Sequence, residues 1–281
     1  MNDDACVDFL QWCLPKLNKQ WSGFRRVRGQ VCKRITRRMQ KLDLRSLDAY
    51  RDHLAAHPEE WDRLDAMCRI TISRFYRDRG VFDALCDPLL PGLIQHLQDQ
   101  EAPALRAWSA GCASGEEPYT LRIIWQQELF DQIPDVSLHI TATDAEVHML
   151  DRAQTACYAR STLKELPEAW VDAAFDYDKS RDDEPYCLRP VYKRGIEWRQ
   201  QDVRQEMPGG PFHLILCRNL VFMYFDEALQ RRCLEGMLDR LAPRGLLVLG
   251  KHDALPDGAW PLAAWDEHKR IYRYRSNHAR M

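Results

Sequence analysis

From residue 104 onward, short apolar runs alternate with stretches of helical periodicity, and this alternation restricts the fold more than any other feature. The apolar runs are ALRAWSAG, SLHITATD, FHLILCRN and GLLVLGKH, and each stops at a polar or glycine-bearing turn. After the first three come EEPYTLRIIWQQELF, EVHMLDRAQTACY and DEALQRRCLEGMLDRLAP, whose apolar residues recur at helical spacing. Strands that alternate with helices predict an α/β fold with a mainly parallel, doubly wound sheet.

The residues before this point show no strand pattern and are typical of helices. One apolar stripe has members four residues apart: Val27, Val31, Ile35 and Met39. Ser46 is a suitable N-cap for a further helix, and Pro58 suits the first turn of the next one. We therefore predict an all-helical N-terminal domain over residues 1–85 and an α/β domain over residues 86–281.

Positive charge is concentrated near the N-terminus. The net charge of the whole chain is −2, yet the segment from Lys16 to Arg51 holds twelve basic residues against the two acids Asp43 and Asp48. Such a segment attracts acidic protein surfaces or nucleic acid. The alternative is a solvated helix face without a partner.

Cysteine spacing and the N-terminal residues bear on metal sites and on location. The ten cysteines include no CxxC pair and no cluster with histidine at zinc-ligand spacing, so we expect no metal site. We expect reduced thiols that pack as small apolar groups. The N-terminus MNDDACVDFL carries acids where a secretory leader is basic, and no run suits a membrane span. We therefore expect a cytoplasmic protein without membrane insertion.

Small or polar residues follow three of the predicted strands. The loop from Gly111 to Gly115 follows the first, Asp144 ends the second, and Asn219 follows the third. Open parallel sheets bind ligands at the carboxyl ends of their strands, so these residues predict one binding crevice.

Two adjacent acids indicate which cofactor this crevice would accept. Glu116 and Glu117 begin the helix after the glycine loop, where they would repel a pyrophosphate. S-adenosylmethionine carries a sulfonium and an ammonium, which acids attract, and Asp144 could hold its ribose. The alternatives are structural, with Glu116 as a helix-dipole partner and Asp144 as a helix cap.

Four stretches resemble the chemotaxis receptor methyltransferases of the CheR family, in the same order along the chain. They are ITISRFYRDRGVFDAL, WSAGCASGEEPYTL, TATDAEVHMLDRAQTACY and FHLILCRNLVFMYFD. The resemblance implies a Rossmann-like domain that binds S-adenosylmethionine, yields S-adenosylhomocysteine and methylates glutamate side chains of a receptor helix. It also implies a helical N-terminal domain and a small antiparallel β subdomain inserted at about residues 175–200.

The resemblance also implies site residues. Cofactor contacts would fall on Ser73, Arg77, Gly111, Glu117, Asp144, Asp202, Val203, Asn219 and Leu220. Arg77 and Tyr224 would be catalytic, because an arginine can fix a substrate carboxylate and a tyrosine hydroxyl can hold the acceptor. The structural alternatives are an interdomain salt bridge at Arg77 and Asp78, and a Tyr224 that only packs under the following helix.

The acceptor stays open at this point. One residue more separates Asn219 from Tyr224 than in the family pattern, which suggests a small-molecule acceptor as the alternative to an acidic receptor helix. A cofactor-binding regulatory module without turnover is a further possibility. Nucleic acid is disfavoured, because no Asn/Asp-Pro-Pro-Tyr-type motif follows the third strand. A carboxylate acceptor needs no general base, and none of the nine histidines stands in these motifs.

Overall fold

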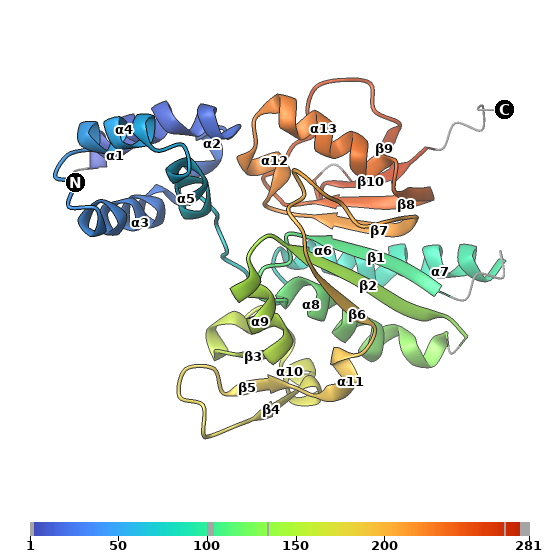
Figure 1. Cartoon of the computed structure of the whole chain (residues 1–281). Helices are drawn as coiled ribbons and strands as arrows, with labels where there is room; N and C mark the ends of the chain where they lie inside the picture. Colours follow the sequence, from blue (N-terminus) through green and yellow to red (C-terminus); the bar gives the residue numbers. More distant parts are fainter. Residues whose placement is uncertain (1–2, 100–103, 134, 267, 276–281) are drawn as a thin grey trace. The chain divides into compact units, whose positions relative to one another are not determined.

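The computed structural model describes residues 3–99, 104–133, 135–266 and 268–275 (Figure 1). The chain forms two compact units. The helical unit comprises Met1–Ile70 and Met223–Gln230, and the sheet unit comprises Thr71–Phe222 and Arg231–Met281. The predicted domain boundary at residue 85 stays a prediction, because compact units need not coincide with the domains of a family.

The helices of the helical unit follow the apolar stripes of the sequence. They are α1 (Asp3–Cys13), α2 (Trp21–Phe24), α3 (Arg28–Lys41), α4 (Leu47–Ala56) and α5 (Glu60–Met67), with a 3-10 turn at Leu14–Leu17. Val31, Ile35 and Met39 of α3 are buried, as their spacing predicts. The hydroxyl of Ser46 accepts a hydrogen bond from the backbone N–H of Ala49 at 3.1 Å, which confirms the predicted N-cap of α4.

Two of the basic side chains of α3 stabilise the helical unit itself. The guanidinium of Arg38 donates to both carboxylate oxygens of Glu60, at 2.8 and 2.6 Å, and the Tyr50 hydroxyl donates to the same carboxylate at 2.9 Å. The hydrogen bonds from Arg38 hold the pKa of Glu60 below its ordinary value. Arg34 donates to two backbone carbonyls at and just after the end of α5. These two arginines therefore contribute to folding.

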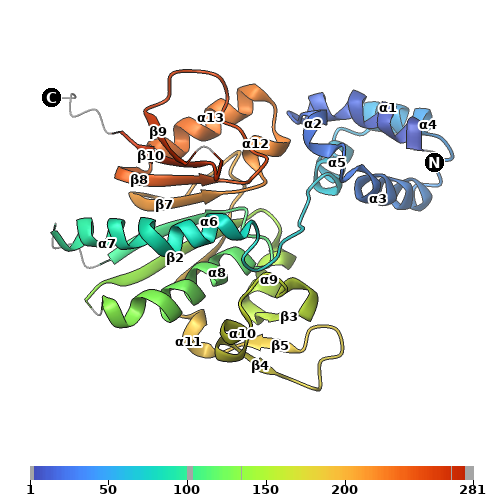
Figure 2. The ribbon, with the colours of Figure 1, turned by 180° about the vertical axis from the view of Figure 1, so that it is seen from behind.

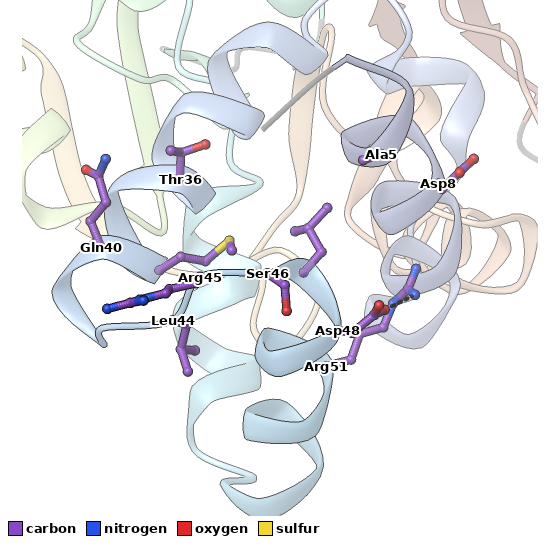
Figure 3. Close-up of a pocket in the computed structure, with 11 residues that line it drawn as sticks. Ala5, Asp8, Thr36, Gln40, Leu44, Arg45, Ser46, Asp48 and Arg51 are labelled. Carbon is purple, nitrogen blue, oxygen red and sulfur yellow. Dashed lines mark hydrogen bonds and ion pairs between the residues drawn. The ribbon is translucent and has the colours of Figure 1, made fainter.

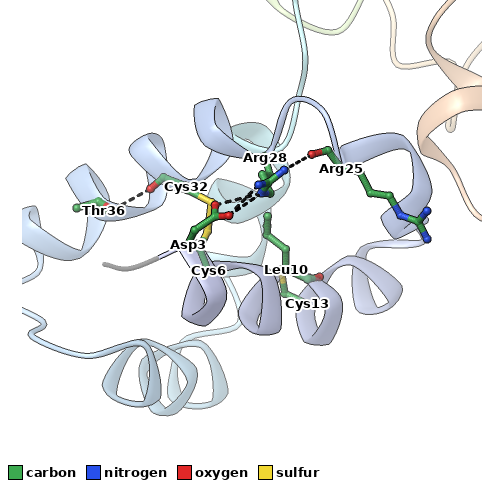
Figure 4. Close-up of a disulfide and its surroundings, with 8 residues drawn as sticks. All are labelled: Asp3, Cys6, Leu10, Cys13, Arg25, Arg28, Cys32 and Thr36. Atoms are coloured by element: carbon green, nitrogen blue, oxygen red, sulfur yellow. Dashed lines mark hydrogen bonds and ion pairs between the residues drawn. A yellow bond between two sulfur atoms is a disulfide. The ribbon is translucent and has the colours of Figure 1, made fainter.

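Four cysteines form disulfides, so the expectation of reduced thiols is wrong for them. Cys6 of α1 is bonded to Cys32 of α3 (Figure 4), and Cys157 is bonded to Cys187. The partners are 26 and 30 residues apart, and they meet only once α1 lies beside α3 and two short strands pair. Sequence spacing alone gives no sign of such contacts. The free cysteines are mostly buried, as expected: Cys13, Cys68, Cys86, Cys112, Cys217 and Cys233.

Reduction of the Cys6–Cys32 disulfide is expected to destabilise the helical unit. A cross-link that closes a loop of 26 residues restricts the unfolded chain and contributes about 3–4 kcal/mol to the free energy of unfolding. Urea unfolding with and without dithiothreitol measures the loss. A variant with serine at all four disulfide positions should not respond to the reductant. Titration of ten free thiols in the denatured, unreduced protein would contradict this prediction.

The sheet unit contains the predicted parallel sheet. Its seven strands lie in the order β6-β2-β1-β7-β8-β10-β9, and the first five of these are parallel to one another. The strands are β1 (Ala104–Ala110), β2 (Ser137–Asp144), β6 (Ile196–Gln200), β7 (Phe212–Cys217), β8 (Leu241–Leu249), β9 (Leu262–Asp266) and β10 (Ile271–Tyr274). β10 pairs antiparallel with β8 and β9. The α/β fold class is therefore confirmed.

Helices cover both faces of this sheet. Helices α6 (Arg79–Ala84), α7 (Leu90–Asp99) and α8 (Glu116–Ile124) lie on the face that Figure 2 presents, and α13 (Glu227–Leu238) lies on the face of Figure 1. The remaining α-helices are α9 (Val147–Thr155), α10 (Glu168–Ala174), α11 (Pro190–Lys193) and α12 (Val221–Tyr224). In the part of the chain that the structure describes, no helix combines the length and apolar character needed to cross a bilayer.

A small antiparallel sheet is inserted between α9 and β6, as the family resemblance implies. Its strands, in spatial order, are β3 (Cys157–Tyr158), β5 (Tyr186–Leu188) and β4 (Phe175–Tyr177). The insertion begins earlier and ends earlier than the predicted residues 175–200. β6 pairs in parallel with β2 and so belongs to the main sheet. A strand pattern in the sequence does not reveal which of two sheets a strand joins.

Candidate active site

The carboxyl ends of β2, β1 and β7 are adjacent, because these parallel strands are neighbours in that order. The register pairs Ala110, the last residue of β1, with Thr143 of β2. Asp144 ends β2, Gly111 directly follows β1, and Asn219 lies two residues after β7. The predicted crevice residues therefore come to one edge of the sheet.

The loop after β1 requires glycine at both of its ends. Gly111 and Gly115 have φ values of +74° and +91°, in the left-handed region that side chains disfavour. A Cβ on Gly111 would lie 2.5 Å from a methyl group of Leu220, and one on Gly115 would lie 2.9 Å from the Cβ of Ala153. The loop therefore packs closely on both the β7 side and the α9 side, and Gly111 and Leu220 are neighbours.

Asp144 connects this loop to the start of α9. One carboxylate oxygen accepts a hydrogen bond from the backbone N–H of Ala113, and the other accepts one from the N–H of Glu146, both at 2.9 Å. Glu146 is the N-cap residue of α9, so Asp144 binds the start of this helix, as the structural alternative for Asp144 expects. A carboxylate has about four lone-pair positions, so two backbone donors do not exclude ribose hydroxyls as further donors.

Arg218 links three segments of the sheet unit, a role that its place in the sequence does not predict. Its guanidinium donates to Glu117 at 3.0 Å, to the Asp78 carboxylate at 2.9 Å and to the backbone carbonyl of Arg77 at 2.5 Å. Only 3% of its side chain is exposed. Glu117 also accepts a hydrogen bond from the Ser109 hydroxyl at 2.7 Å. Glu117 and Asp78 therefore share the single positive charge of a buried arginine.

Arg77 lies beside Asn219 at the end of β7. It donates to the side-chain oxygen of Asn219 at 3.2 Å. The backbone N–H groups of Asn219 and Gly250 both donate to one carboxylate oxygen of Asp253, at 2.8 Å each. Asp253 is fully buried, and burial raises the pKa of its carboxyl. In the sheet unit the carboxylate of Asp78 pairs with Arg218, and Arg77 instead orients Asn219.

Ser73 lies near Glu116 in the first turn of α8 and opposes the rise of its pKa. The Glu116 carboxylate accepts hydrogen bonds from the Ser114 hydroxyl at 2.9 and 3.0 Å. Glu116 is 2% exposed, and this burial raises the pKa of its carboxyl. Glu116 is therefore part of the support of the loop, which agrees with the structural role expected for it.

The segment after β6 lies beside the end of β2, because the N–H of Gln201 donates to the Asp144 carbonyl at 3.1 Å. The side chain of Asp202 forms an ion pair with the Arg204 guanidinium, and Val203 is 8% exposed.

The side-chain oxygen of Gln201 is buried and has no hydrogen-bond partner among the described residues. A buried acceptor without a donor points to a missing ligand or water. Gln201 carries no motif that a sequence could reveal.

Tyr224 belongs to the helical unit, whereas Arg77 belongs to the sheet unit. The Tyr224 ring packs on Phe24, with 5.1 Å between ring centroids, and the residue is 8% exposed. The additional residue between Asn219 and Tyr224 lies in a chain segment that forms the single helical turn α12. The catalytic assignments of Arg77 and Tyr224 stay predictions.

Among the described residues, no three or more His, Cys, Asp or Glu side chains are grouped as metal ligands. The expected absence of a metal stays a prediction.

Known proteins identify the family. A family model described as the SAM-binding domain of CheR methyltransferases matches residues 71–264, and a model of their all-alpha domain matches residues 27–65. A chemotaxis protein methyltransferase of Listeria monocytogenes is 31% identical over 198 residues, which cover 70% of this chain and 71% of that protein. Chemotaxis protein methyltransferase 2 of Pseudomonas aeruginosa is 30% identical over 222 residues, which cover 78% of this chain and 76% of that protein. The chain therefore belongs to the CheR family of S-adenosylmethionine-dependent methyltransferases.

Proposed function

We propose that this protein transfers the methyl group of S-adenosylmethionine to a glutamate carboxylate in an acidic helix of a chemotaxis receptor. The main support is the group of acidic and amide side chains at the adjacent ends of β2, β1 and β7, in a chain of the CheR family. The names of the relatives, chemotaxis protein methyltransferases, favour a receptor as the acceptor.

The residues at these strand ends fit S-adenosylmethionine. Asp144 would accept from the ribose hydroxyls, and the orphaned oxygen of Gln201 would accept from the amino group of adenine. The carboxylates of Asp78, Glu117 and Asp144 outnumber the guanidiniums of Arg77 and Arg218 around this edge. Such a site suits a cofactor with a positively charged end.

For methyl transfer to a carboxylate, the protein mainly has to bind and orient the two reactants. S-adenosylmethionine supplies an activated methyl group, and the glutamate acceptor is already an anion at neutral pH. Arg77 has five N–H donors, so it can hold Asn219 and still orient the acceptor carboxylate. Tyr224 would orient the acceptor through its hydroxyl. In-line placement and exclusion of water would then provide most of the acceleration.

The helical unit offers a surface for an acidic helix. Lys33, Arg37 and Lys41 are exposed and lie four residues apart on α3, and they have no ion pair or hydrogen bond of their side chains within the described residues. Lys33 and Arg37 line a hollow of about 450 Å³ between α1 and α3. A second hollow of about 480 Å³ (Figure 3) shares Thr36 and Gln40 with it, so the two hollows are neighbours on α3, and together they are called the groove along α3.

Replacement of Lys33, Arg37 and Lys41 by glutamine is expected to weaken acceptor binding and to leave cofactor binding unchanged. Each lost surface charge contributes about 0.2–1 kcal/mol, so KM for the receptor should rise roughly 3- to 150-fold and depend less on salt. Turnover of receptor-containing membranes across a range of salt concentrations measures this effect. The matched control replaces the exposed Lys164, Lys179 and Arg275 of the sheet unit. Equal KM values in both triple variants would contradict the assigned surface.

The acceptor class is tested with methyl-tritiated S-adenosylmethionine and membranes from bacteria that express a chemotaxis receptor. The expected result is label in a protein ester that base releases as methanol. Label only in the small-molecule fraction would indicate a small-molecule acceptor instead. Cofactor binding without transfer to any acceptor would indicate a regulatory module.

A further inference from the structure

We infer that the helical unit positions Tyr224 through Gln20, Gly23 and Phe24, which hold the segment from Met223 to Asp226. This inference rests on the proposed function, in which the Tyr224 hydroxyl orients the acceptor. It adds three positioning residues that no sequence motif indicates, all of them within the N-terminal helical part of the chain.

The first observation is a set of hydrogen bonds between two short segments of the helical unit. The N–H of Gln20 donates to the carbonyl of Tyr224 at 3.0 Å, and its side-chain amide donates to the carbonyl of Met223 at 3.1 Å. The N–H of Asp226 donates to the carbonyl of Asn18 at 2.9 Å. The backbone on both sides of the Tyr224 side chain is therefore fixed by the loop between α1 and α2.

The second observation is the absence of space for a side chain at Gly23. A Cβ on Gly23 would lie 2.1 Å from the Met223 carbonyl oxygen and 3.1 Å from the Tyr224 ring. Both are closer than a Cβ normally approaches, and the Met223 oxygen belongs to the backbone, so the whole segment would have to move. A Cβ on Gly29, in the next helix α3, would meet no neighbouring atom within 4 Å, so Gly29 serves as a natural comparison.

The third observation is that the holding loop is itself firmly attached. Lys19 is 4% exposed and forms an ion pair with Asp65 of α5. It also forms an isolated antiparallel bridge with Phe225. Phe24 is fully buried, and its ring contacts that of Tyr224 at 59°. A buried pair and a buried ring give the loop little freedom, so the position of Tyr224 follows that of the helical unit.

The consequence concerns the acceptor side of the reaction. The groove along α3 and the segment that carries Tyr224 belong to the same compact unit. A shift of that segment would therefore misplace Tyr224 relative to an acceptor held in the groove, while the cofactor residues of the sheet unit would be unaffected. Misplacement by about 1 Å lowers turnover roughly 100-fold when reacting groups must be aligned.

The test compares Gly23→Ala with Gly29→Ala. Methyl transfer from tritiated S-adenosylmethionine to receptor-containing membranes gives kcat and KM, and calorimetry with S-adenosylhomocysteine gives the cofactor Kd. We expect kcat to fall roughly 100-fold in Gly23→Ala with an unchanged cofactor Kd, and no change in Gly29→Ala. Hydrogen exchange should become faster in residues 223–226 in the first variant only.

A second variant covers the case in which Gly23→Ala fails to fold. Gln20→Ala removes the side-chain hydrogen bond to the Met223 carbonyl and keeps the backbone bonds, and it is expected to lower kcat about tenfold. In a Tyr224→Phe background the same substitution should have no further effect, because coupled residues are not additive. A wild-type kcat in both Gln20→Ala and Gly23→Ala, or an equal loss of activity in the Tyr224→Phe background, would overturn the inference. Failure of the wild-type protein to bind the cofactor or to label the receptor would instead refute the proposed function.

Discussion

Replacement of Arg218 by alanine is expected to lower the free energy of unfolding of the sheet unit by about 3–5 kcal/mol and to remove most cofactor affinity. Arg218 is almost fully buried between the carboxylates of Glu117 and Asp78, and it also donates to a carbonyl of the segment before α6. Without the guanidinium, two carboxylates remain in a poorly hydrated place without a cation. Urea unfolding and calorimetric titration with S-adenosylhomocysteine measure the two effects.

Two variants separate the role of Arg218 from that of an ordinary ion pair. Arg199→Ala removes an exposed pair with Glu197, and it should cost less than about 1 kcal/mol and leave cofactor binding intact. Arg218→Lys keeps the charge, but a lysine cannot span Glu117 and Asp78 as a planar fork does, so an intermediate loss is expected. An Arg218→Ala variant with normal stability and normal cofactor affinity would show that the network has no such role.

The parts of the fold that depend on local patterns were predictable. The alternation of apolar runs and helical stretches gave the parallel sheet, and the four-residue spacing of apolar residues gave α3. Ser46 was recognisable as an N-cap because capping involves only the next three residues. The adjacency of the carboxyl ends of β2, β1 and β7 was also predictable, because neighbouring parallel strands end at the same edge of a sheet.

Contacts between distant segments were not predictable. The Cys6–Cys32 disulfide depends on how α1 packs on α3, and the inclusion of residues 223–230 in the helical unit depends on the loop around Gln20. Arg218 stands in a recognised motif, but its two acidic partners are 101 and 140 residues away in sequence. Gln201 carries no pattern at all, and only its burial without a partner distinguishes it.

Asp144 can have a structural role and a cofactor-binding role at the same time. Its carboxylate holds the N–H groups of Ala113 and Glu146, and it would also accept from the ribose hydroxyls of the cofactor. Asp144→Ala is therefore expected to weaken S-adenosylhomocysteine binding by about 1–3 kcal/mol, or roughly 5- to 150-fold in Kd, because a buried polar ligand group loses its partner. Calorimetric titration measures the change.

The control for Asp144→Ala must remove a carboxylate that accepts a backbone hydrogen bond but lies away from the proposed cofactor site. Asp178 does so in an exposed turn, where it accepts a hydrogen bond from the N–H of Ser180 at 3.0 Å. Asp178→Ala should leave the cofactor Kd unchanged and cost at most about 1 kcal/mol of stability. If Asp144→Ala loses stability while the variant still binds S-adenosylhomocysteine as tightly as the wild-type protein, Asp144 only ties the glycine loop to α9. The ribose must then be held by other groups at this edge of the sheet.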